Sequence, residues 1–353
     1  MSLVHSIGVA LLRTLDAETA HDLSIKALKA GLGPAQSGPD DPILATELCG
    51  LQLNNPVGLA AGFDKHAQAH RAMIAAGFGF VECGTVTPLP QPGNPRPRVF
   101  RLLADRAVIN RYGFNSEGLE VFAHNLSLRP TSGVVGANIG ANKEATDRIG
   151  DYVTGLRRLW PLADYFTVNI SSPNTPGLRN LQARAALDDL LGRVAEVRSE
   201  LQNPRLKKPI FLKVAPDLAE PEIDDVVASV AANGIEAIIV GNTTLSRPDS
   251  LRSPQKSEAG GLSGAPLFDL STRVLKQFAD RTRGGPIKLI GVGGIGSGAD
   301  AYAKLRAGAS AVQLYSLLAL EGPGLIQATK RDLAARLRAD GFKSVAEAVG
   351  TNP

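Results

Sequence analysis

The sequence predicts an α/β protein of the (β/α)8-barrel class, a TIM barrel, preceded by an N-terminal helical arm. Two observations predict this fold: eight short apolar runs alternate with amphipathic helical stretches, and each run is apolar throughout rather than at every second residue. Continuous apolar runs are typical of parallel strands that are buried on both faces. Eight strand–helix units in succession form a barrel, and a length of 353 residues suits one domain of that kind.

The predicted arm comprises residues 1–38, and the predicted barrel domain comprises residues 39–353. Within the arm, apolar residues recur at helical spacing over residues 3–32, and the pairs Gly33-Pro34 and Gly38-Pro39 end the helical signal. The charges of the arm nearly cancel, so it resembles an apolar cap more than a polybasic anchor. The residues with this spacing are Ile7, Leu11, Leu12, Leu15, Leu23, Ala27 and Leu28.

Eight predicted strands follow in order along the barrel domain. An open, doubly wound sheet is the alternative fold, but eight strands are present and no Gly-x-Gly-x-x-Gly string follows the first of them. The predicted strands are Val57–Ala61, Phe80–Val86, Val134–Ile139, Tyr165–Ile170, Ile210–Ala215, Ala237–Gly241, Leu289–Gly293 and Ala311–Leu314. Helical segments between them include Ala67–Ala76, Leu187–Leu201, Pro221–Asn233 and Ala299–Ala307.

The alternation of strands and helices is interrupted by two long connections, residues 174–183 after the fourth strand and residues 242–266 after the sixth. We expect both to lack regular structure, and long loops of that kind in a compact domain are usually functional or mobile. Both follow the carboxyl ends of strands, where barrel active sites lie. The sequence therefore predicts that these loops border the functional site.

Composition restricts the function classes. The net charge is only +4 and no block of Lys and Arg stands out, so we do not expect a nucleic-acid partner. Two cysteines are too few for an iron–sulfur cluster or a structural zinc site, so no metal is expected, and they fit a reducing cytoplasm. No apolar stretch is long enough to span a membrane, and the N-terminal segment lacks the layout of a signal peptide.

A glycine-rich string after the seventh strand predicts a phosphate site. Residues 291–296 contain four glycines, and Ser297 then opens a helix, so backbone N–H groups and a positive helix end are offered to an anion. The loops after strands seven and eight form the recurrent phosphate site of barrels. A second glycine-rich string at residues 260–264 strengthens the prediction of a phosphate-bearing cofactor. A plain tight turn is the alternative interpretation.

Two lysines are placed where positive charge is costly or useful. Lys213 lies inside an apolar strand, where a buried ammonium costs several kcal/mol unless it is paired. Lys65 follows Asp64 in a glycine-containing turn after the first strand, and a surface salt bridge is the alternative for it. Fixed cations stabilise negative charge that develops in a dry site. A flavin that accepts hydride becomes anionic around N1 and O2 and would meet such cations.

Carboxamide side chains gather at predicted strand ends and adjoining loops. Each amide both donates and accepts hydrogen bonds, so the set matches a planar heterocycle with alternating N–H and C=O groups, such as a pyrimidine dione. Turn-forming asparagine is the alternative for any single member. The set is Asn110, Asn115, Asn138, Asn169, Asn174 and Asn242, with Thr243 beside the last.

Ser172 lies beside Pro173, two residues before Asn174, in the predicted loop after the fourth strand. No His or Asp stands nearby in the sequence, so a hydrolytic triad is not indicated. A serine oxygen can still relay a proton when an adjacent carbonyl activates the carbon acid and water is excluded.

Four strings together resemble class 2, quinone-dependent dihydroorotate dehydrogenases. They are AGFDK at residues 61–65, NRYGFN at 110–115, NISSPNTPGLR at 169–179 and GVGGI at 291–295. The resemblance covers essentially the whole chain, in order and with compatible spacing. Three interpretations compete with this resemblance. They are another FMN barrel such as a dihydrouridine synthase, a flavin-free phosphate-binding lyase or isomerase, and a non-catalytic small-molecule binder.

The resemblance implies oxidation of (S)-dihydroorotate to orotate in pyrimidine synthesis, with FMN passing electrons to a membrane quinone. Ser172 would take the C5 proton while hydride leaves C6 for flavin N5. Substrate contacts would come from Lys65, Asn110, Arg111, Tyr112, Gly113, Phe114, Asn169, Asn174, Asn242 and Thr243. FMN contacts would come from Ala61, Gly62, Phe63, Asp64, Lys65, Thr85, Asn138, Asn169, Lys213, Gly241, Gly264, Tyr315 and Ser316, with Gly293 or Gly294 at the phosphate.

Two features imply class 2 rather than class 1. Class 1 relatives use a cysteine as the base, whereas this chain has Ser172, and they lack the arm or use an iron–sulfur partner subunit, which is not expected here. The arm resembles the family's quinone tunnel, with His21 and Arg101 as candidate quinone contacts. A helix-cap role for His21 and a surface ion pair for Arg101 are the alternatives. The expected location is peripheral, on the cytoplasmic side of a bacterial membrane, because no Arg-rich presequence is present.

Overall fold

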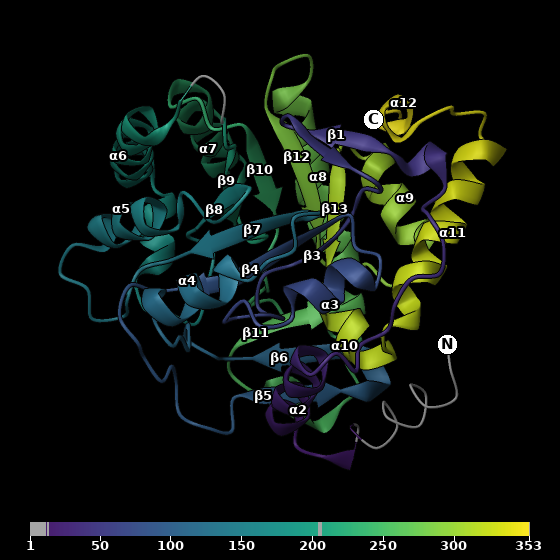
Figure 1. The fold of residues 1–353 in the computed structure, drawn as a ribbon, viewed down its shortest axis with the longest axis horizontal. Coiled ribbons are helices and arrows are strands. Elements are labelled where there is room, and N and C mark those ends of the chain that lie inside the picture. Colours follow the sequence, from purple (N-terminus) through teal and green to yellow (C-terminus); the bar gives the residue numbers. More distant parts are fainter. Residues whose placement is uncertain (1–11, 13, 204–206, 353) are drawn as a thin grey trace.

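The computed structural model describes residue 12, residues 14–203 and residues 207–352, and it confirms the predicted barrel (Figure 1). Eight parallel strands close in the order β10-β12-β13-β3-β4-β7-β8-β9. The boundaries agree with the predicted runs to within two residues at each end. The barrel strands are β3 (Val57–Leu59), β4 (Phe80–Val86), β7 (Val134–Ile139), β8 (Tyr165–Asn169), β9 (Ile210–Val214), β10 (Ala237–Val240), β12 (Lys288–Val292) and β13 (Ala311–Leu314).

Helices surround the barrel, with α5, α6 and α7 on one side and α9 and α11 on the other (Figure 1). The four helical segments named from the sequence are α3, α6, α7 and α9. The helices around the barrel are α3 (His70–Ala75), α4 (Leu119–Ser127), α5 (Arg148–Leu159), α6 (Arg184–Leu201), α7 (Glu220–Ala232), α8 (Phe268–Thr282), α9 (Gly298–Arg306), α10 (Ser316–Glu321), α11 (Gly324–Ala339) and α12 (Val345–Ala348). Short 3-10 turns are η1 (Pro42–Leu44), η2 (Leu103–Asp105), η3 (Leu178–Gln182), η4 (Pro254–Ser257) and η5 (Ala265–Leu267).

The amino-terminal end of the barrel is filled by aromatic rings and covered by a small hairpin. Tyr165 and Phe211 are fully buried, and their ring centroids lie 4.9 Å apart. A Cβ atom at Gly136 would lie 2.1 Å from the Tyr165 ring, so the glycine makes room for it. The hairpin strands β1 (Thr46–Leu48) and β2 (Leu51–Leu53) pack Leu48 and Leu53 against these rings. This packing closes the amino-terminal end of the barrel and leaves its carboxyl end for a ligand site.

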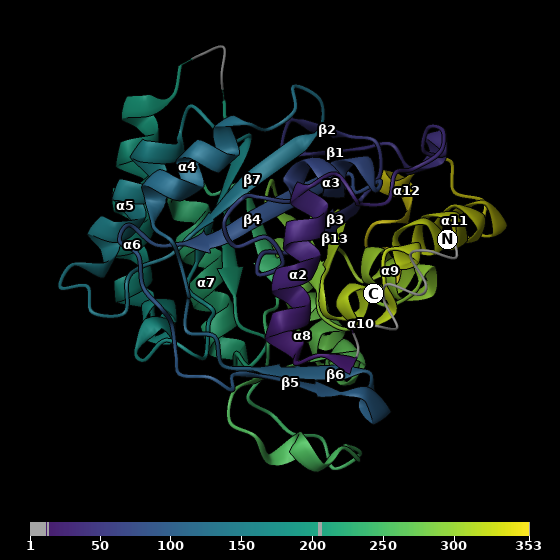
Figure 2. The same cartoon turned by 60° about the horizontal axis from the view of Figure 1, so that its bottom comes forward.

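The connection over residues 242–266 differs from the prediction, because it contains regular structure. Its strand β11 (Gly261–Gly264) pairs antiparallel with β6 (Ala107–Asn110), which pairs with β5 (Val99–Leu102). The sequence Gly-Leu-Ser-Gly has little intrinsic strand preference, so only the distant partner makes it a strand. The connection over residues 174–183 likewise contains the short turn η3. The three-stranded sheet lies beside the arm helix at the barrel mouth (Figure 2).

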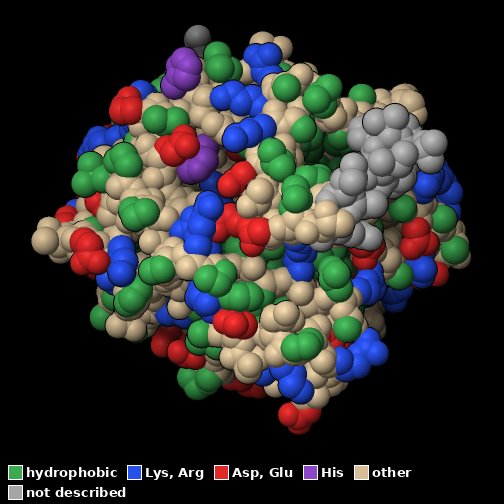
Figure 3. Space-filling model, turned by 90° about the horizontal axis from the view of Figure 1, so that it is seen from below, with side chains coloured by type: hydrophobic (Ala, Val, Ile, Leu, Met, Phe, Trp, Pro, Cys, Tyr) green, Lys and Arg blue, Asp and Glu red, His purple; other side chains and the backbone are tan. Residues whose placement is uncertain are grey.

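The described part of the arm contains the amphipathic helix α2 (Ala17–Lys29), capped by Asp16, whose carboxylate accepts the N–H groups of Glu18 and Thr19. The predicted helical residues Ile7 and Leu11 lie outside the described residues. On the side of the molecule where α2 lies, basic and acidic side chains are interspersed (Figure 3). In the described part of the chain no helix has the length and apolar character needed to cross a membrane.

A buried ion pair attaches α2 to the barrel domain. Glu18 is 5% exposed and accepts hydrogen bonds from Nε and Nη2 of Arg98, at 3.0 and 2.7 Å. Arg98 also donates to the backbone carbonyls of Pro92 and Asn94. Burial by itself raises the pKa of Glu18, but the hydrogen bond and charge of Arg98, with smaller contributions from Arg96, outweigh it and hold the pKa below its usual 4.5.

We expect Glu18→Gln to lower the free energy of unfolding by about 3 kcal/mol near neutral pH, because it leaves the Arg98 guanidinium buried without a counter-charge. Since the folded pKa of Glu18 is depressed, this stabilisation is complete above pH ~4.5 and disappears as the pH falls through the folded value. Urea unfolding of the parent and the variant between about pH 3 and pH 7 measures the difference. A difference that stays constant over that range would contradict the assignment.

Candidate active site

One deep cavity of about 780 Å³ opens at the carboxyl end of the barrel strands and extends beneath α2. A smaller one of about 70 Å³ shares Lys213, Tyr315 and Ser316 with it and contains Gly264, Gly293 and Gly294. The structure therefore brings most of the predicted site residues to one place. Those lining the larger cavity are His21, Ala61, Gly62, Phe63, Lys65, Thr85, Arg101, Asn110, Tyr112, Gly113, Phe114, Asn115, Asn169, Ser172, Asn174, Lys213, Asn242, Thr243, Tyr315 and Ser316.

The glycine-rich end of the site is shaped by backbone that excludes side chains. Gly293 and Gly294 have φ values of +102° and +76°, and a Cβ atom at Gly294 would lie 2.6 Å from the backbone nitrogen of Phe268. Ser263 and Ser316 join their hydroxyls by a 2.8 Å hydrogen bond beside these glycines. Ser263 was missed by sequence reasoning, although its position in the second glycine-rich string could have indicated it.

The start of α9 contributes less to an anion site than the sequence suggested. The hydroxyl of Ser297 accepts the N–H of Asp300, and the Asp300 carboxylate accepts the N–H of Gly296 at 2.9 Å. The N–H of Asp300 in the first turn and the N–H of Gly296 just before the helix are therefore bonded within the chain. Any anion at this end depends on the glycine loop itself and on the neighbouring hydroxyls.

Lys213 points into the barrel interior from β9 and is only 4% exposed. Its ammonium lies 4.0 Å from Oε1 of Glu82, a fully buried carboxylate on β4. Burial lowers the pKa of Lys213, while Glu82 opposes that shift. Sequence reasoning missed Glu82, although a carboxylate within an otherwise apolar strand was the available signal. Glu82 accepts further hydrogen bonds from Asn138 (2.7 Å), Thr167 (2.9 Å) and Gln313 (2.9 Å).

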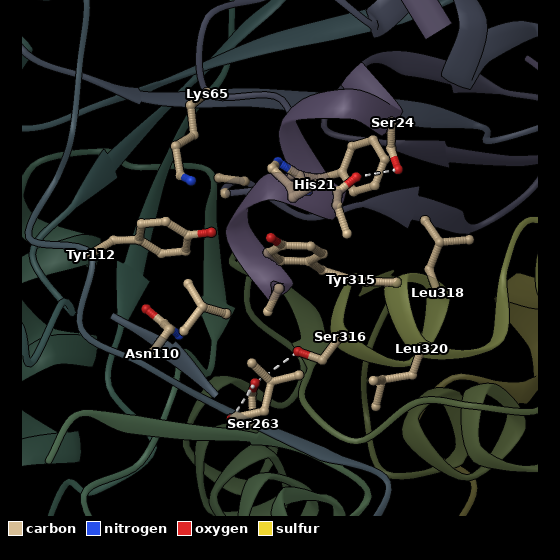
Figure 4. Close-up of a pocket in the computed structure, with 18 of the residues that line it drawn as sticks. His21, Ser24, Lys65, Asn110, Tyr112, Ser263, Tyr315, Ser316, Leu318 and Leu320 are labelled. Atoms are coloured by element: carbon tan, nitrogen blue, oxygen red, sulfur yellow. Dashed lines mark hydrogen bonds between the residues drawn. The ribbon is translucent and has the colours of Figure 1, made fainter. Parts of the chain in front are cut away.

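Lys65 reaches the cavity from the loop after β3, and its ammonium lies 3.4 Å from the centroid of the Tyr112 ring (Figure 4). Burial lowers the pKa of Lys65 to about 7, and Glu18 acts in the opposite direction. An anionic ligand would favour the charged form of this lysine. The surface salt bridge considered from the sequence is wrong, because the side chain is inside the cavity.

The amides form a hydrogen-bonded set around the cavity. Asn169 donates to Thr85 at 2.8 Å and accepts the hydroxyl of Ser171 at 2.8 Å, and Asn242 donates to that same hydroxyl at 2.8 Å. Asn174 donates to the backbone carbonyl of Asn110 at 3.1 Å. Ser171 was missed by sequence reasoning and has no distinguishing signal beside Ser172.

Two buried polar atoms that belong to cavity-lining residues have no hydrogen-bond partner within the described chain, Oδ1 of Asn115 and Oγ1 of Thr243. Buried polar atoms without partners are rare because each costs about 1–3 kcal/mol. Partnerless polar atoms in residues of a cavity wall fit a polar ligand, which would complete their hydrogen bonding when bound.

Ser172 lines the cavity and is 6% exposed, and its hydroxyl oxygen accepts the N–H of Asn174 at 3.3 Å. The loop that carries it is fixed by Arg179, which donates to the carbonyls of Ser171 and Thr243 and pairs with Asp217 at 2.9 Å. The serine oxygen is therefore held in a nearly dry position by the loop itself.

Four predicted contact residues do not line either cavity. Arg111 points outward and pairs with Glu258 at 2.8 Å. Asn138 lies deeper in the barrel interior than the cavity wall, and it is hydrogen-bonded to Glu82 and Thr85. Gly241, at φ +127°, provides room for the backbone of β12 rather than for a cavity. The carboxylate of Asp64 accepts two backbone N–H groups of its own loop, from residues 68 and 69.

Asp64 also lies near two further buried groups, His70 and Cys83, with one potential ligand atom from each within 4.8 Å of the others. Both oxygens of Asp64 already accept backbone N–H groups, and the thiol of Cys83 donates to the same carboxylate. These contacts explain Asp64 as a loop-capping residue without an ion.

The outer part of the cavity is apolar and is entered past three rings. His21 on α2, Phe63 and Tyr315 pack with centroid distances of 5.4 Å (His21–Phe63) and 5.7 Å (Phe63–Tyr315), and Leu318 and Leu320 lie beyond them (Figure 4). Burial lowers the pKa of His21 to about 3, and the nearby Lys65 acts in the same direction, so the imidazole is neutral. Helix capping is performed by Asp16 rather than by His21.

Arg101, the second candidate quinone contact, lies on β5 at the rim of the cavity. It donates to the backbone carbonyls of Leu12 and Leu15, which precede α2. The guanidinium therefore joins the arm to the three-stranded sheet at the cavity wall.

The closed barrel and the deep cavity at the carboxyl end of its strands have the architecture of (β/α)8-barrel enzymes. A family model described as dihydroorotate dehydrogenase matches residues 43–337. The chain belongs to the dihydroorotate dehydrogenase family, whose members are oxidoreductases, and its relatives place it in class 2. It is 57% identical over 347 residues to a dihydroorotate dehydrogenase (quinone) of Xanthobacter autotrophicus, covering 97% of each chain, and 55% identical over 348 residues to one of Brucella melitensis, covering 98% of this chain and 95% of that one.

Solved structures support the same assignment. The ligand-free DHODH of Eimeria tenella superposes with a TM-score of 0.92 at 41% identity, over 96% of this chain and 99% of that chain. The DHODH of Eimeria tenella in complex with ferulenol gives a TM-score of 0.91 at 40% identity, over 95% of each chain.

Proposed function

We propose that this chain oxidises (S)-dihydroorotate to orotate in pyrimidine synthesis, with FMN as cofactor and a membrane quinone as electron acceptor. One observation carries the proposal: two adjoining cavities that share Lys213 bring together a glycine-lined end, a buried ammonium, a cluster of amides with Ser172, and an apolar outer part beneath α2. The relatives named dihydroorotate dehydrogenase (quinone) support the choice of substrate and acceptor.

The chain's own residues fit FMN. The glycine loop at Gly293 and Gly294 leaves space for a phosphate that a Cβ atom would remove, and Ser263 and Ser316 add hydroxyls beside it. Lys213 supplies a fixed positive charge deeper in the barrel, where Glu82 holds it. When bound, FMN supplies the capacity to accept a hydride and to release electrons to a second substrate.

Dihydroorotate would bind above Lys213, among the amides. The partnerless oxygens of Asn115 and Thr243 suit the ring N–H groups of the substrate, and the ammonium of Lys65 suits its carboxylate. Ser172 would take the proton from C5, because its oxygen lies in a nearly dry wall and its loop is fixed by Arg179. Excluding water protects the proton transfer from competing solvent.

The apolar outer part of the cavity would admit the quinone, with His21 and Arg101 near its ring. In this proposal residues 1–38 act as a separate arm on the catalytic domain of residues 39–353. Leu15, Leu23 and Leu32 are 40%, 43% and 72% exposed and give the arm an apolar surface. Such a surface supports peripheral attachment to the cytoplasmic side of a bacterial membrane.

Anaerobic mixing of the purified protein with dihydroorotate tests the proposed activity. We expect the flavin absorbance to bleach within the mixing experiment and to recover when a soluble quinone is added. Protein that carries no flavin and cannot be reconstituted with FMN, or flavin that dihydroorotate does not bleach, would contradict the proposal.

Removing residues 1–38 should leave bleaching by dihydroorotate within about threefold of the parent, and should slow recovery by quinone by about 100-fold or more, because the wall that aligns the quinone is lost. Full-length Glu18→Gln is the control, since it removes the ion pair with Arg98 but keeps the tunnel wall. Normal quinone turnover in the shortened protein would contradict the tunnel assignment.

A further inference from the structure

Lys304 on α9 is a fully buried lysine that none of the roles above requires. Its exposure is 0%, and its stem packs against β12 where Gly291 leaves room, since a Cβ atom there would lie 3.3 Å from Cβ of Lys304. Among the described residues no carboxylate lies within 4.0 Å of its ammonium. The Phe268 ring centroid lies 5.0 Å from the ammonium, but a ring face offsets only part of the cost of removing this charge from water, so the buried ammonium requires a further explanation.

The ammonium is directed at the back of the glycine loop. It donates to the hydroxyl of Ser271 at 2.6 Å, and that hydroxyl lies 3.1 Å from the carbonyl of Gly293 and 3.1 Å from that of Phe268. The loop is tightly fitted here, because a Cβ atom at Gly293 would lie 2.8 Å from the same hydroxyl. A continuous series of hydrogen bonds therefore runs from Lys304 through Ser271 to Gly293, which lines the small cavity.

Both signs of charge lie around this loop, since the Asp300 carboxylate accepts the N–H of Gly296 while Lys304 reaches the back of the loop through Ser271. Burial lowers the pKa of Lys304 to about 7, and the carboxylates of Asp300 and Asp269 act against that shift only at longer range. Arg106, a second cation beside the loop, is paired with Glu321. Lys213 also lines the small cavity but is paired with Glu82, so Lys304 is positioned to supply further positive charge for a ligand bound there.

We propose that Lys304 is a positioning residue for the phosphate of the flavin: its ammonium acts through the Ser271 hydroxyl on the Gly293 loop and supplies the counter-charge of the phosphate site. This inference rests on the proposed function, because FMN brings the phosphate. A phosphate stabilises the buried ammonium in return, so the lysine should distinguish FMN from riboflavin, which lacks the phosphate.

The test is a competition on the full-length holoenzyme. The protein is equilibrated with mixtures of FMN and riboflavin, separated from free flavin, and the ratio of the two bound flavins is measured by chromatography. Lys304→Met should lower the preference for FMN over riboflavin by about 10- to 100-fold, the range for a hydrogen bond to a charged group. Lys304→Gln, which can still bond to Ser271 but carries no charge, should lower it similarly.

Two further variants keep the test decisive. Lys330 is a buried lysine with its own carboxylate partner, Asp40 at 2.6 Å, and it does not line the cavities, so Lys330→Met should leave the flavin preference unchanged. Ser271→Ala retains the ammonium but removes the hydroxyl, and should also lower the preference, which preserves the test if the Lys304 variants do not fold.

The outcomes separate this inference from the proposed function. An unchanged preference in the Lys304 variants or in Ser271→Ala would overturn the role of the lysine, as would a parallel loss of both flavins, which indicates only a packing role. Parent protein that binds neither flavin would instead refute the proposed function itself.

Discussion

Replacing Ser172 by alanine is expected to slow bleaching of the bound flavin by dihydroorotate by about 10²- to 10⁴-fold, the usual contribution of a positioned general base. The serine oxygen is held by the N–H of Asn174 in a wall that is only slightly exposed, so water has little opportunity to replace it. Stopped-flow absorbance under anaerobic conditions measures the rate. Flavin content should be unchanged, because the glycine loop and Lys213 are intact.

Ser171→Ala is the matched control for this variant. Its hydroxyl bonds to Asn169 and Asn242 and does not line the cavity, so its loss should weaken substrate binding more than it slows the proton transfer. If Ser172→Ala bleaches the flavin at nearly the parent rate, or if both variants slow it equally at saturating substrate, Ser172 is not the base.

Replacing Lys213 by methionine is expected to weaken flavin binding by about 3 kcal/mol, which corresponds to a loss of more than 100-fold in affinity. Methionine retains most of the buried volume but removes the charge beside the flavin and leaves Glu82 without its cation. Flavin content after purification and the FMN concentration needed for reconstitution measure the effect.

The double variant Lys213→Met with Glu82→Gln separates the two consequences. Neutral glutamine can keep hydrogen bonds with Thr167 and Gln313, so the double variant should recover stability without recovering flavin affinity. Flavin binding that returns with stability would show that Lys213 acts only by neutralising Glu82.

The sequence by itself determined the barrel and most of the mouth. Strands buried on both faces are apolar at every position, and this property is local, so the runs Phe80–Val86 and Val134–Ile139 are predicted with the same ends that β4 and β7 have. Polar residues at the carboxyl ends of parallel strands must converge once the barrel closes. The local pattern alone therefore predicts that Lys213, Asn169 and Ser172 share one site, and the larger cavity contains all three.

Only the tertiary structure decided which neighbours those residues have. Strand β11 exists because β6, about 150 residues earlier in the chain, pairs with it, and Glu82 is satisfied by side chains from three other strands. The same holds for Lys304 and Ser271, which lie on different helices. Such contacts join positions far apart in the sequence, and neither spacing nor composition specifies them, because their energy is gained only when the chain closes on itself.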